Sequence, residues 1–482
     1  FTPYIYKTAD YGKSWTRITA GIPADEFVRV VREDPVQRGL LYAGTERGVY
    51  VSFTDGARWE PLRLARSGNK TGDGTLPPVP VHDLAVKEGD LVAGTHGRSF
   101  WILDDLSALR QMTPAIAAKP AHLFAPRDAY RTQWSGGRGA DAARPVGQNP
   151  PSGATVYYWL KQPRQVVTLD FLDARGAVVK RFTSDPDSLT VRDSVRGDSV
   201  KLARRDSLVR TGLSADSVQK LQAASEGGGE SGGGGEDEDG PRRPPRPARV
   251  ANKAGLNAFT WNLRYPDASS FENMILWAGG TQGPLAPPGA YAVRLAVGGR
   301  PVATERFAVR PDPRATATPN DYAAQFALLS QIRDKVTEAN DAVTMVRSVR
   351  GQLASREAKL AAEKRRAVTA AASALLARIG AVEAELYQVR NQSGQDPLNY
   401  PIKLNNQLSA LSNVVASTEA RPTKQAGEAY TLLAGQIDAQ LQQLRQAMET
   451  LLPRVNAALK AAGAPEIAPV ARPAAIAQAS PS

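Results

Sequence analysis

Hydrophobic and polar positions alternate in short segments along the first hundred residues, a pattern typical of β-strands. The tripeptide Ala-Gly-Thr begins at Ala43 and recurs 50 residues later at Ala93, and each copy lies between two of these segments. Short strands that recur about every 40 to 50 residues are typical of β-propeller blades. The predicted strands cover residues 27–31, 48–52, 81–86 and 99–103.

A second repeat involves a predicted tight turn between strands. Its first copy has the form T-x-D-x-G-x-S-W, and its second copy is offset from the first by 44 residues. In the second copy Thr54 falls opposite the aspartate and Asp55 comes one residue late, so this copy is degenerate. The residues of the two copies are Thr8, Asp10, Gly12, Ser14 and Trp15, and then Ser52, Asp55, Gly56 and Trp59.

These residue types are expected to hold a turn rather than to catalyse a reaction. An aspartate carboxylate accepts hydrogen bonds from the main chain of its own turn, glycine adopts positive φ, and tryptophan packs a large apolar face between sheets. The pattern resembles the Asp-box, or BNR, repeat of sialidases, xyloglucanase-type glycosidases and sortilin (Vps10) propellers. That resemblance implies a structural role on the outside of each blade, away from a central site.

The number of predicted blades indicates an incomplete propeller in residues 1–110. Residues 4–18 supply the end of one blade, residues 27–63 a second, and residues 80–104 three strands of a third. Propellers close with about four to eight blades, and an open stack would leave unpaired strand edges. We therefore expect further blades upstream of residue 1.

The densest group of chemically active side chains follows in residues 95–105, THGRSFWILDD. In one interpretation, paired aspartates and an imidazole act as acid and base in glycoside hydrolysis. In the other, the aspartates end a strand, the arginine pairs with a carboxylate, and Trp101 packs between sheets. We favour the second, because adjacent residues of a strand point to opposite faces. The weak catalytic candidates are Asp104, Asp105, His96 and Arg98.

A β-sandwich of the Ig-like kind is predicted for residues 154–310, after a linker at residues 111–153. Its last hairpin, PPGAYAVRL, resembles the closing hairpin of bacterial Ig-like domains, which implies a spacer or docking module. Trp261 and Tyr291 are expected in the core. The predicted strands cover residues 154–160, 165–173, 176–182, 257–263, 286–297 and 301–310.

An insertion at residues 184–256 divides the predicted sandwich. Its second part, EGGGESGGGGEDEDGPRRPPRPAR, has too few apolar residues to form a core and is expected to be disordered. The glycine run lacks the G-K-[ST] sequence of a phosphate-binding loop. Nucleotide binding is therefore not expected here.

From Thr318 onward the hydrophobic spacing changes to three and four residues, which predicts helices. Thr318 can cap a helix whose first residue is Pro319. We expect an antiparallel bundle of four helices at residues 318–460, able to support oligomers, and a disordered tail at residues 461–482. The four predicted seams include Leu329, Ile332, Val336, Ala339, Val343, Val346 and Leu353; Leu375, Ile379, Val382, Leu386 and Val389; Leu404, Leu408, Leu411 and Val415; and Tyr430, Leu433, Ile437, Leu444, Met448, Leu451 and Val455.

Composition narrows the classes of partner. The chain has 60 Lys and Arg against 48 Asp and Glu, for a formal net charge of +12, but most charges are interspersed, so nucleic acid is not expected. No apolar run approaches about 20 residues, so no membrane span is expected. With three histidines and no cysteine, neither a metal site, a disulfide nor a cofactor is predicted.

The most specific resemblance combines LVAGTHGRSFWILDDL with LFAPRDAYR at residues 123–131. Together they resemble the last blade and exit segment of bacterial sortilin-like, WD40/YVTN/BNR-repeat proteins that are often labelled glycosyl hydrolases. The resemblance implies a multidomain fold of β and α regions and a secreted or periplasmic location.

We expect a non-catalytic C-terminal portion of such a protein, binding a protein, peptide or glycan ligand. The alternative is part of a xyloglucanase-like or sialidase-like glycoside hydrolase whose catalytic carboxylates lie mostly in upstream blades. A third, weaker interpretation is a surface scaffold that assembles through its helices.

Overall fold

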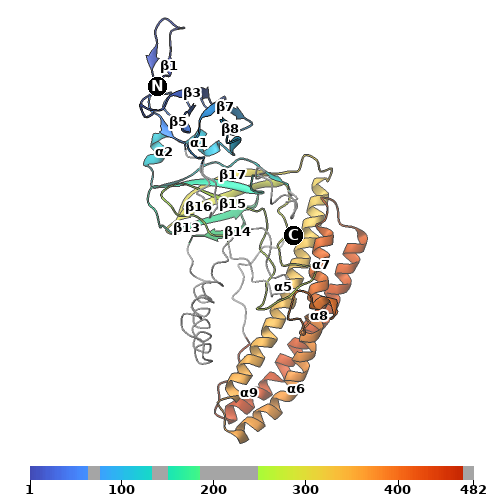
Figure 1. Ribbon diagram of the computed structural model, residues 1–482. Coiled ribbons are helices and arrows are strands. Elements are labelled where there is room, and N and C mark those ends of the chain that lie inside the picture. The colour runs from blue at the N-terminus through green and yellow to red at the C-terminus, as the bar shows by residue number, and fades with distance from the viewer. Residues whose placement is uncertain (63–75, 133–149, 185–247, 470–482) are drawn as a thin grey trace.

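The computed structural model describes residues 1–62, 76–132, 150–184 and 248–469. Most of the predicted insertion and of the predicted tail lies outside these residues. The fold is mixed, with several β-sheets followed by long helices, as predicted at that level (Figure 1). The sheets formed by residues 6–103 lie at one end of the molecule, two further sheets lie next to them, and the helices extend away from these two.

The first region, which we call the β-stack, comprises a hairpin and two antiparallel sheets with consecutive strand order. Its strands match the predicted segments to within a few residues. They are β1 (Tyr6–Lys7) and β2 (Thr16–Arg17); β3 (Val28–Glu33), β4 (Leu41–Thr45), β5 (Val49–Ser52) and β6 (Glu60–Pro61); and β7 (Val81–Lys87), β8 (Asp90–Thr95) and β9 (Phe100–Leu103).

The two sheets of the β-stack repeat the same strand register. Tyr42 on β4 pairs with Val51 on β5, and fifty residues later Val92 on β8 pairs with Ile102 on β9. Two glycines also correspond, because Gly44 and Gly94 each face a residue of the following strand. The sequence repeat is therefore a repeat of structure.

The hairpin β1–β2 has the register of the last two strands of the first sheet. Tyr6 pairs with Arg17 in the hairpin, and Tyr50 pairs with Pro61 between β5 and β6. Each residue of the second pair follows its counterpart in the first by 44 residues, which is the offset between the two turn motifs. Its inner side chain, Ile5, packs on the first sheet. The hairpin thus repeats half of a sheet.

The three elements of the β-stack pack face to face through two apolar layers. One layer joins the hairpin to the first sheet, and the other joins the first sheet to the second. None of the described residues covers the outer face of the second sheet, where Phe100 is 76% exposed and Ile102 is 57% exposed. Their register equivalents in the first sheet, Val49 and Val51, are each 3% exposed.

The second region has two sheets around one apolar core. The six predicted strands all form, and Trp261 and Tyr291 are buried as predicted. One sheet has the order β10 (Ala121–Leu123), β12 (Ala154–Leu160), β15 (Gly255–Trp261). The other has the order β11 (Ala129–Arg131), β17 (Arg300–Pro311), β16 (Gly289–Val297), β13 (Val167–Leu172), β14 (Val178–Thr183).

Residues 111–153 differ from the predicted linker. After two short helices, α1 (Ser107–Gln111) and α2 (Pro114–Ala118), they supply β10 and β11. β10 pairs with β12, and β11 pairs in parallel with β17, so both strands complete the sheets of the second region. Each strand has three residues, too few for its alternation to be recognised in the sequence.

The helical region begins at the predicted residue. The Thr318 hydroxyl accepts a bond from the Asp321 main chain, and the Asp321 carboxylate accepts one from the main chain of Thr318, which is a capping box. Pro453 divides the last predicted helix in two, and Val389 lies beyond a helix end and is 49% exposed. The helices are α5 (Pro319–Glu357), α6 (Ala362–Leu386), α7 (Leu404–Val415), α8 (Lys424–Thr450) and α9 (Leu452–Ala461).

One helix among the described residues, α6, is long and apolar enough to cross a bilayer on length and composition alone. Its apolar residues Leu375, Ile379 and Val382 are fully buried against the other helices. That arrangement is typical of the core helix of a bundle, and the absence of a membrane span stays a prediction.

An extended segment at residues 264–285, which we call the strap, connects the second region to the bundle. Bundle side chains bind its main chain: the Asn406 amide accepts from the Trp277 N–H and donates to the Trp277 carbonyl, at 2.7 Å each. Asn340 donates to the Ser269 carbonyl at 2.6 Å. The strap therefore fixes the bundle to the second region.

Candidate functional site

The two turn motifs of the β-stack make the same hydrogen bonds. In the first, the Gly12 N–H donates to the Thr8 hydroxyl at 2.8 Å, and in the second the Gly56 N–H donates to the Ser52 hydroxyl at 3.0 Å. Gly12 and Gly56 have φ of 90° and 85°, which favours glycine. Both motifs therefore shape a turn, as predicted.

The aspartate position differs between the two turns. The Ser14 N–H donates to the Asp10 carboxylate at 2.9 Å, whereas the Arg58 N–H donates to the Thr54 hydroxyl at 2.9 Å. Asp55 instead lies at the next position, where its φ of 55° matches that of Tyr11, and its carboxylate pairs with Lys7. Thr54 is thus the equivalent of Asp10, as the offset of the repeat predicts.

The two tryptophans of the turn motif have different surroundings. Trp59 is 1% exposed, and its indole N–H donates to the Ile18 carbonyl of the hairpin at 2.7 Å. Trp15 is 59% exposed, and its indole N–H donates to Gly12 of its own turn at 3.2 Å. Trp59 packs between neighbouring elements as expected, and Trp15 has no such neighbour among the described residues.

The four weak catalytic candidates do not form one group. His96 and Arg98 lie exposed in the turn before β9, where the His96 ring stacks on His82 at 5.0 Å. Asp104 and Asp105 follow the other end of β9, and a strand of four residues spans about 13 Å. The structure therefore separates the imidazole from the carboxylates.

The Arg98 side chain forms no ion pair with any of the described residues, contrary to the expectation. Its main-chain carbonyl accepts a hydrogen bond from the Trp101 indole N–H at 3.0 Å. Trp101 itself packs against the layer between the two sheets, as expected.

Asp105 has a structural role. Its φ is 65°, its N–H donates to the Asp90 carboxylate at 2.8 Å, and its own carboxylate accepts from the Ser107 N–H at 2.9 Å. These bonds redirect the chain from β9 into α1. The prediction that the aspartates end the strand fits Asp105.

Asp104 has the more unusual environment. Burial raises the pKa of its carboxyl group, and the nearby carboxylate of Asp90 raises this pKa further, while Arg127 opposes both. Burial together with Asp105 and Asp104 also raises the pKa of Tyr157, on β12. A half-buried carboxyl group of this kind could hold a proton, but Asp105 is committed to its turn and does not complete an acid and base pair with it.

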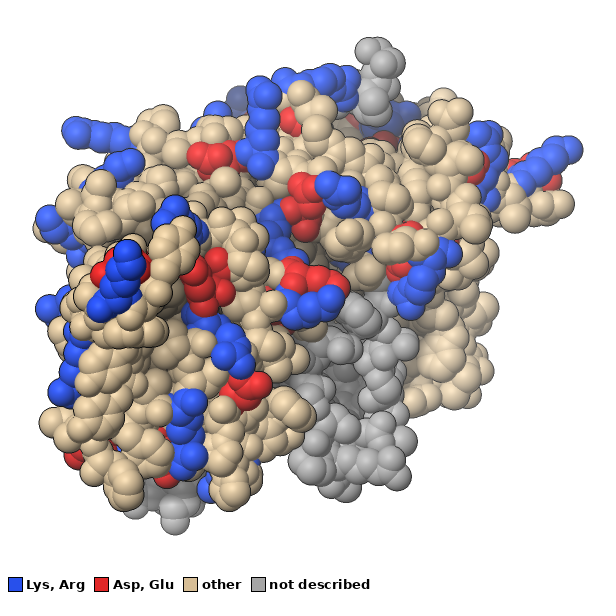
Figure 2. Space-filling view, turned by 90° about the horizontal axis from the view of Figure 1, so that it is seen from above, with Lys and Arg blue, Asp and Glu red and all other residues tan. Residues whose placement is uncertain are grey.

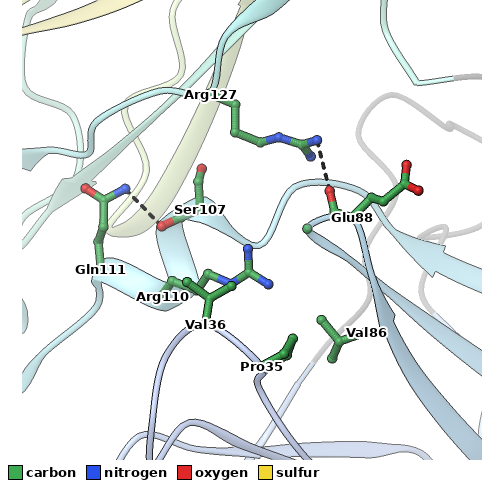
Figure 3. Close-up of a pocket in the computed structure, with 9 residues that line it drawn as sticks. Pro35, Val36, Val86, Glu88, Ser107, Arg110, Gln111 and Arg127 are labelled. Atoms are coloured by element: carbon green, nitrogen blue, oxygen red, sulfur yellow. Dashed lines mark hydrogen bonds between the residues drawn. The ribbon is translucent and has the colours of Figure 1, made fainter.

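A hollow of 440 Å³ lies between the β3–β4 loop, the β7–β8 turn and α1 (Figure 3). Two guanidinium groups face it, and each has a carboxylate partner: Arg110 bonds to the fully buried Asp34 at 3.0 Å, and Arg127 bonds to Asp90 at 3.0 Å. The lining residues are Pro35, Val36, Val86, Glu88, Gly89, Ser107, Arg110, Gln111 and Arg127.

The bonds of Asp34 explain its ionised state. Burial alone would raise its pKa, but hydrogen bonds from the Gln37 and Val36 main chain and from Arg110 lower the pKa overall. Because each cation of the hollow is already paired, the hollow has no surplus positive charge for an anionic ligand. The arrangement holds α1 against the β-stack.

Sequence reasoning did not identify Asp34, Asp90, Arg110 or Arg127. Arg110 and Asp34 are 76 residues apart, and no motif links them. No group of three or more His, Cys, Asp or Glu suited to a metal ion occurs in the part of the chain that the structure describes.

No family model, no curated protein and no solved structure matches this chain.

Proposed function

We propose that the β-stack is part of a BNR-type, Asp-box β-propeller and that the chain is a portion of a secreted or periplasmic bacterial protein of the sortilin-like kind. Its role is to bind a protein, peptide or glycan ligand without catalysis. In this proposal the second region is an Ig-like sandwich, and it serves with the bundle as a docking or spacer module.

One observation carries the propeller part of the proposal. Equivalent residues of the repeat are buried inside the β-stack and exposed at its two ends. At one end, Trp15 is exposed, whereas its equivalent Trp59 is buried inside. At the other end the equivalent pairs are Val51 and Ile102, and Val49 and Phe100. Large apolar faces of this kind mark surfaces that another element covers. Further sheets of the same type would bury both faces.

The chemistry of the described carboxylates supports a binding role over a catalytic one. Glycoside hydrolysis needs two carboxyl groups on either side of the scissile bond, about 5 to 9.5 Å apart. Burial raises the pKa of Asp104, and the neighbouring Asp105 holds a turn. Among the described residues, the environment of Asp104 is therefore the one observation that favours the hydrolase alternative.

The function is tested with the full chain on arrays of xyloglucan oligosaccharides, sialylated glycans and extended peptides, while released reducing sugar is measured in parallel. We expect retention on one ligand class without release of sugar. Sugar release that disappears in Asp104→Asn and persists in the matched variant Asp83→Asn would overturn the non-catalytic role. Absence of retention on every class would overturn the binding role.

A further inference from the structure

The end of the bundle farthest from the β-stack carries an excess of positive charge. There α5 ends, α6 begins and α9 ends, and we call residues 354–371 and 452–467 the bundle tip (Figure 1). The tip has seven Lys and Arg and three Glu. The cations are Arg356, Lys359, Lys364, Arg365, Arg366, Arg454 and Lys460.

The cations of the tip are not neutralised by carboxylates. No ion pair joins any of the seven to an Asp or Glu among the residues described here, whereas several other cations of the bundle are paired. Lys335 pairs with Glu338 at 2.7 Å and with Asp438 at 2.8 Å. At the opposite end of the molecule, basic and acidic side chains lie next to one another (Figure 2). The tip therefore differs from the mixed face that Figure 2 shows.

Three of these cations bond to neutral main-chain carbonyls. Lys364 donates to the Ala462 carbonyl at 3.2 Å, and Arg365 donates to those of Glu357 and Leu360 at 2.9 Å each. Arg356 donates to the Pro465 carbonyl at 2.7 Å. Such bonds satisfy the donors and leave the charges uncompensated.

Helix stability does not account for all of this charge. Cations in the last turn of a helix are favourable, which suits Arg356 in α5 and Lys460 in α9. Lys364, Arg365 and Arg366 instead follow the start of α6, where the partial charge of the helix end is positive. Lys364 and Arg365 are offset by their bonds to carbonyls at the ends of α9 and α5, but Arg366 has no such partner among the described residues, so helix stability explains only part of the cluster.

We propose that the bundle tip is a docking surface for the anionic lipid headgroups of a bilayer. Clusters of about four to eight Lys and Arg near a helix bind anionic lipids through their charge. The tip has no aromatic residue on which nucleic-acid bases could stack, and its cations surround a turn instead of following one helix face that enters a groove. The 39 residues of α5 span about 58 Å, so a docked tip leaves the β-stack in solution.

The test is co-sedimentation of the full chain with phosphatidylcholine vesicles, with and without phosphatidylglycerol. The variant Lys359→Gln/Arg366→Gln/Arg454→Gln/Lys460→Gln removes four exposed cations that form no side-chain hydrogen bond or ion pair with the described residues. The matched control, Lys161→Gln/Lys253→Gln/Arg300→Gln/Arg306→Gln, removes four exposed cations of the second region. Both variants lower the net charge equally, and circular dichroism checks that both remain folded.

We expect binding only to the anionic vesicles, weakened roughly fivefold for each tip cation removed. Raising the ionic strength from about 0.1 M to about 1 M, which shortens the Debye length from about 10 Å to about 3 Å, should abolish it. The control variant should bind like the unchanged chain. Equal losses in both variants, or equal binding to neutral vesicles, would overturn the proposal. Tighter, tip-dependent binding of a short DNA duplex would reassign the surface to nucleic acid and overturn the lipid partner.

Discussion

The β-stack and the bundle differ in how completely they cover their own apolar surfaces. In the bundle, the predicted seam residues of α5 are buried, and the strap covers a further part of the helices. In the β-stack, apolar side chains are uncovered at both ends, with Trp15 at one end and Phe100 at the other. Within the described residues, the seam of α5 is covered by the bundle's own chain, and the β-stack repeats an interface that it does not close.

This difference follows from the kind of repeat that each region uses. Helices in a bundle bury one face each toward a common centre, so four or five are enough. Each sheet of a stack has two apolar faces and needs a neighbour on both sides. A stack covers itself only when it closes on itself or meets a partner.

The largest expected effect is a difference in stability between substitutions of two tryptophans that have the same position in the repeat. Trp59→Ala should lower the free energy of unfolding by about 4 kcal/mol, because it opens a cavity between the hairpin and the first sheet. Trp15→Ala should change it by less than about 0.5 kcal/mol, because its side chain is exposed. Urea unfolding monitored by far-ultraviolet circular dichroism measures both.

The same two substitutions also test the propeller proposal. In a longer form of the protein that includes further blades, Trp15→Ala should become as costly as Trp59→Ala. An equal cost of the two substitutions in the present chain would contradict the comparison between the inside and the ends of the β-stack.

A second test concerns the junction between the second region and the bundle. The Arg131 guanidinium, 4% exposed, bonds to Glu419 at 3.2 Å and to Gln325 at 2.9 Å. Arg131→Met should cost about 3 kcal/mol, because it leaves a partly buried carboxylate unpaired. The double variant Arg131→Met/Glu419→Gln should recover much of this loss in thermal unfolding. No recovery would indicate that packing on Tyr322 matters more than charge.

Removing bonds between the strap and the bundle is expected to have a smaller effect on stability. Asn406→Ala removes both bonds to the Trp277 main chain and should cost about 1 kcal/mol, since a partly buried N–H and carbonyl lose their partners. Limited proteolysis should then cut within residues 264–285 sooner than in the unchanged chain. Asn413→Ala is the matched control, because it removes one exposed bond, to Ala278. Equal proteolysis of both variants would count against the strap as the connection.

The smallest expected effect is a dependence of stability on pH. It is expected for the first turn, which contains Asp10, and not for the second, which has Thr54 at that position. Hydrogen bonds from the Ser14 side chain and main chain and from Thr8 lower the pKa of Asp10 to about 2. The stabilisation is therefore present above the unfolded pKa of about 4 and is lost as pH falls toward 2. A carbon-13 titration of the Asp10 carboxyl group should show a midpoint near 2. Ser14→Ala should raise this midpoint, and an unchanged value would contradict the stated cause.

Local patterns predicted much of this fold because their causes are local. Thr318, Pro319 and Asp321 lie within one turn of chain, so the start of α5 could be recognised from the residues alone. The turn motif likewise spans eight residues, and the offset of 44 that places Thr54 opposite Asp10 is visible by alignment. Val389 was predicted in a seam and is exposed, because α6 ends at Leu386 and the period no longer applies.

Contacts between distant segments could not be predicted from such patterns. Arg110 meets Asp34, and Arg131 meets Glu419, across separations of 76 and 288 residues. The short strands β10 and β11 have no period of their own and form because longer strands offer them an edge.

The sequence by itself determined the repeat of the first region, the six long strands of the second and the start and seams of the bundle. These depend on spacing and residue type within one element. Only the tertiary structure decided that His96 and Asp104 lie at opposite ends of β9, that the strap binds the bundle, and that equivalent apolar residues differ in burial. Those outcomes depend on which surfaces meet in space, and residue spacing along a chain does not specify that.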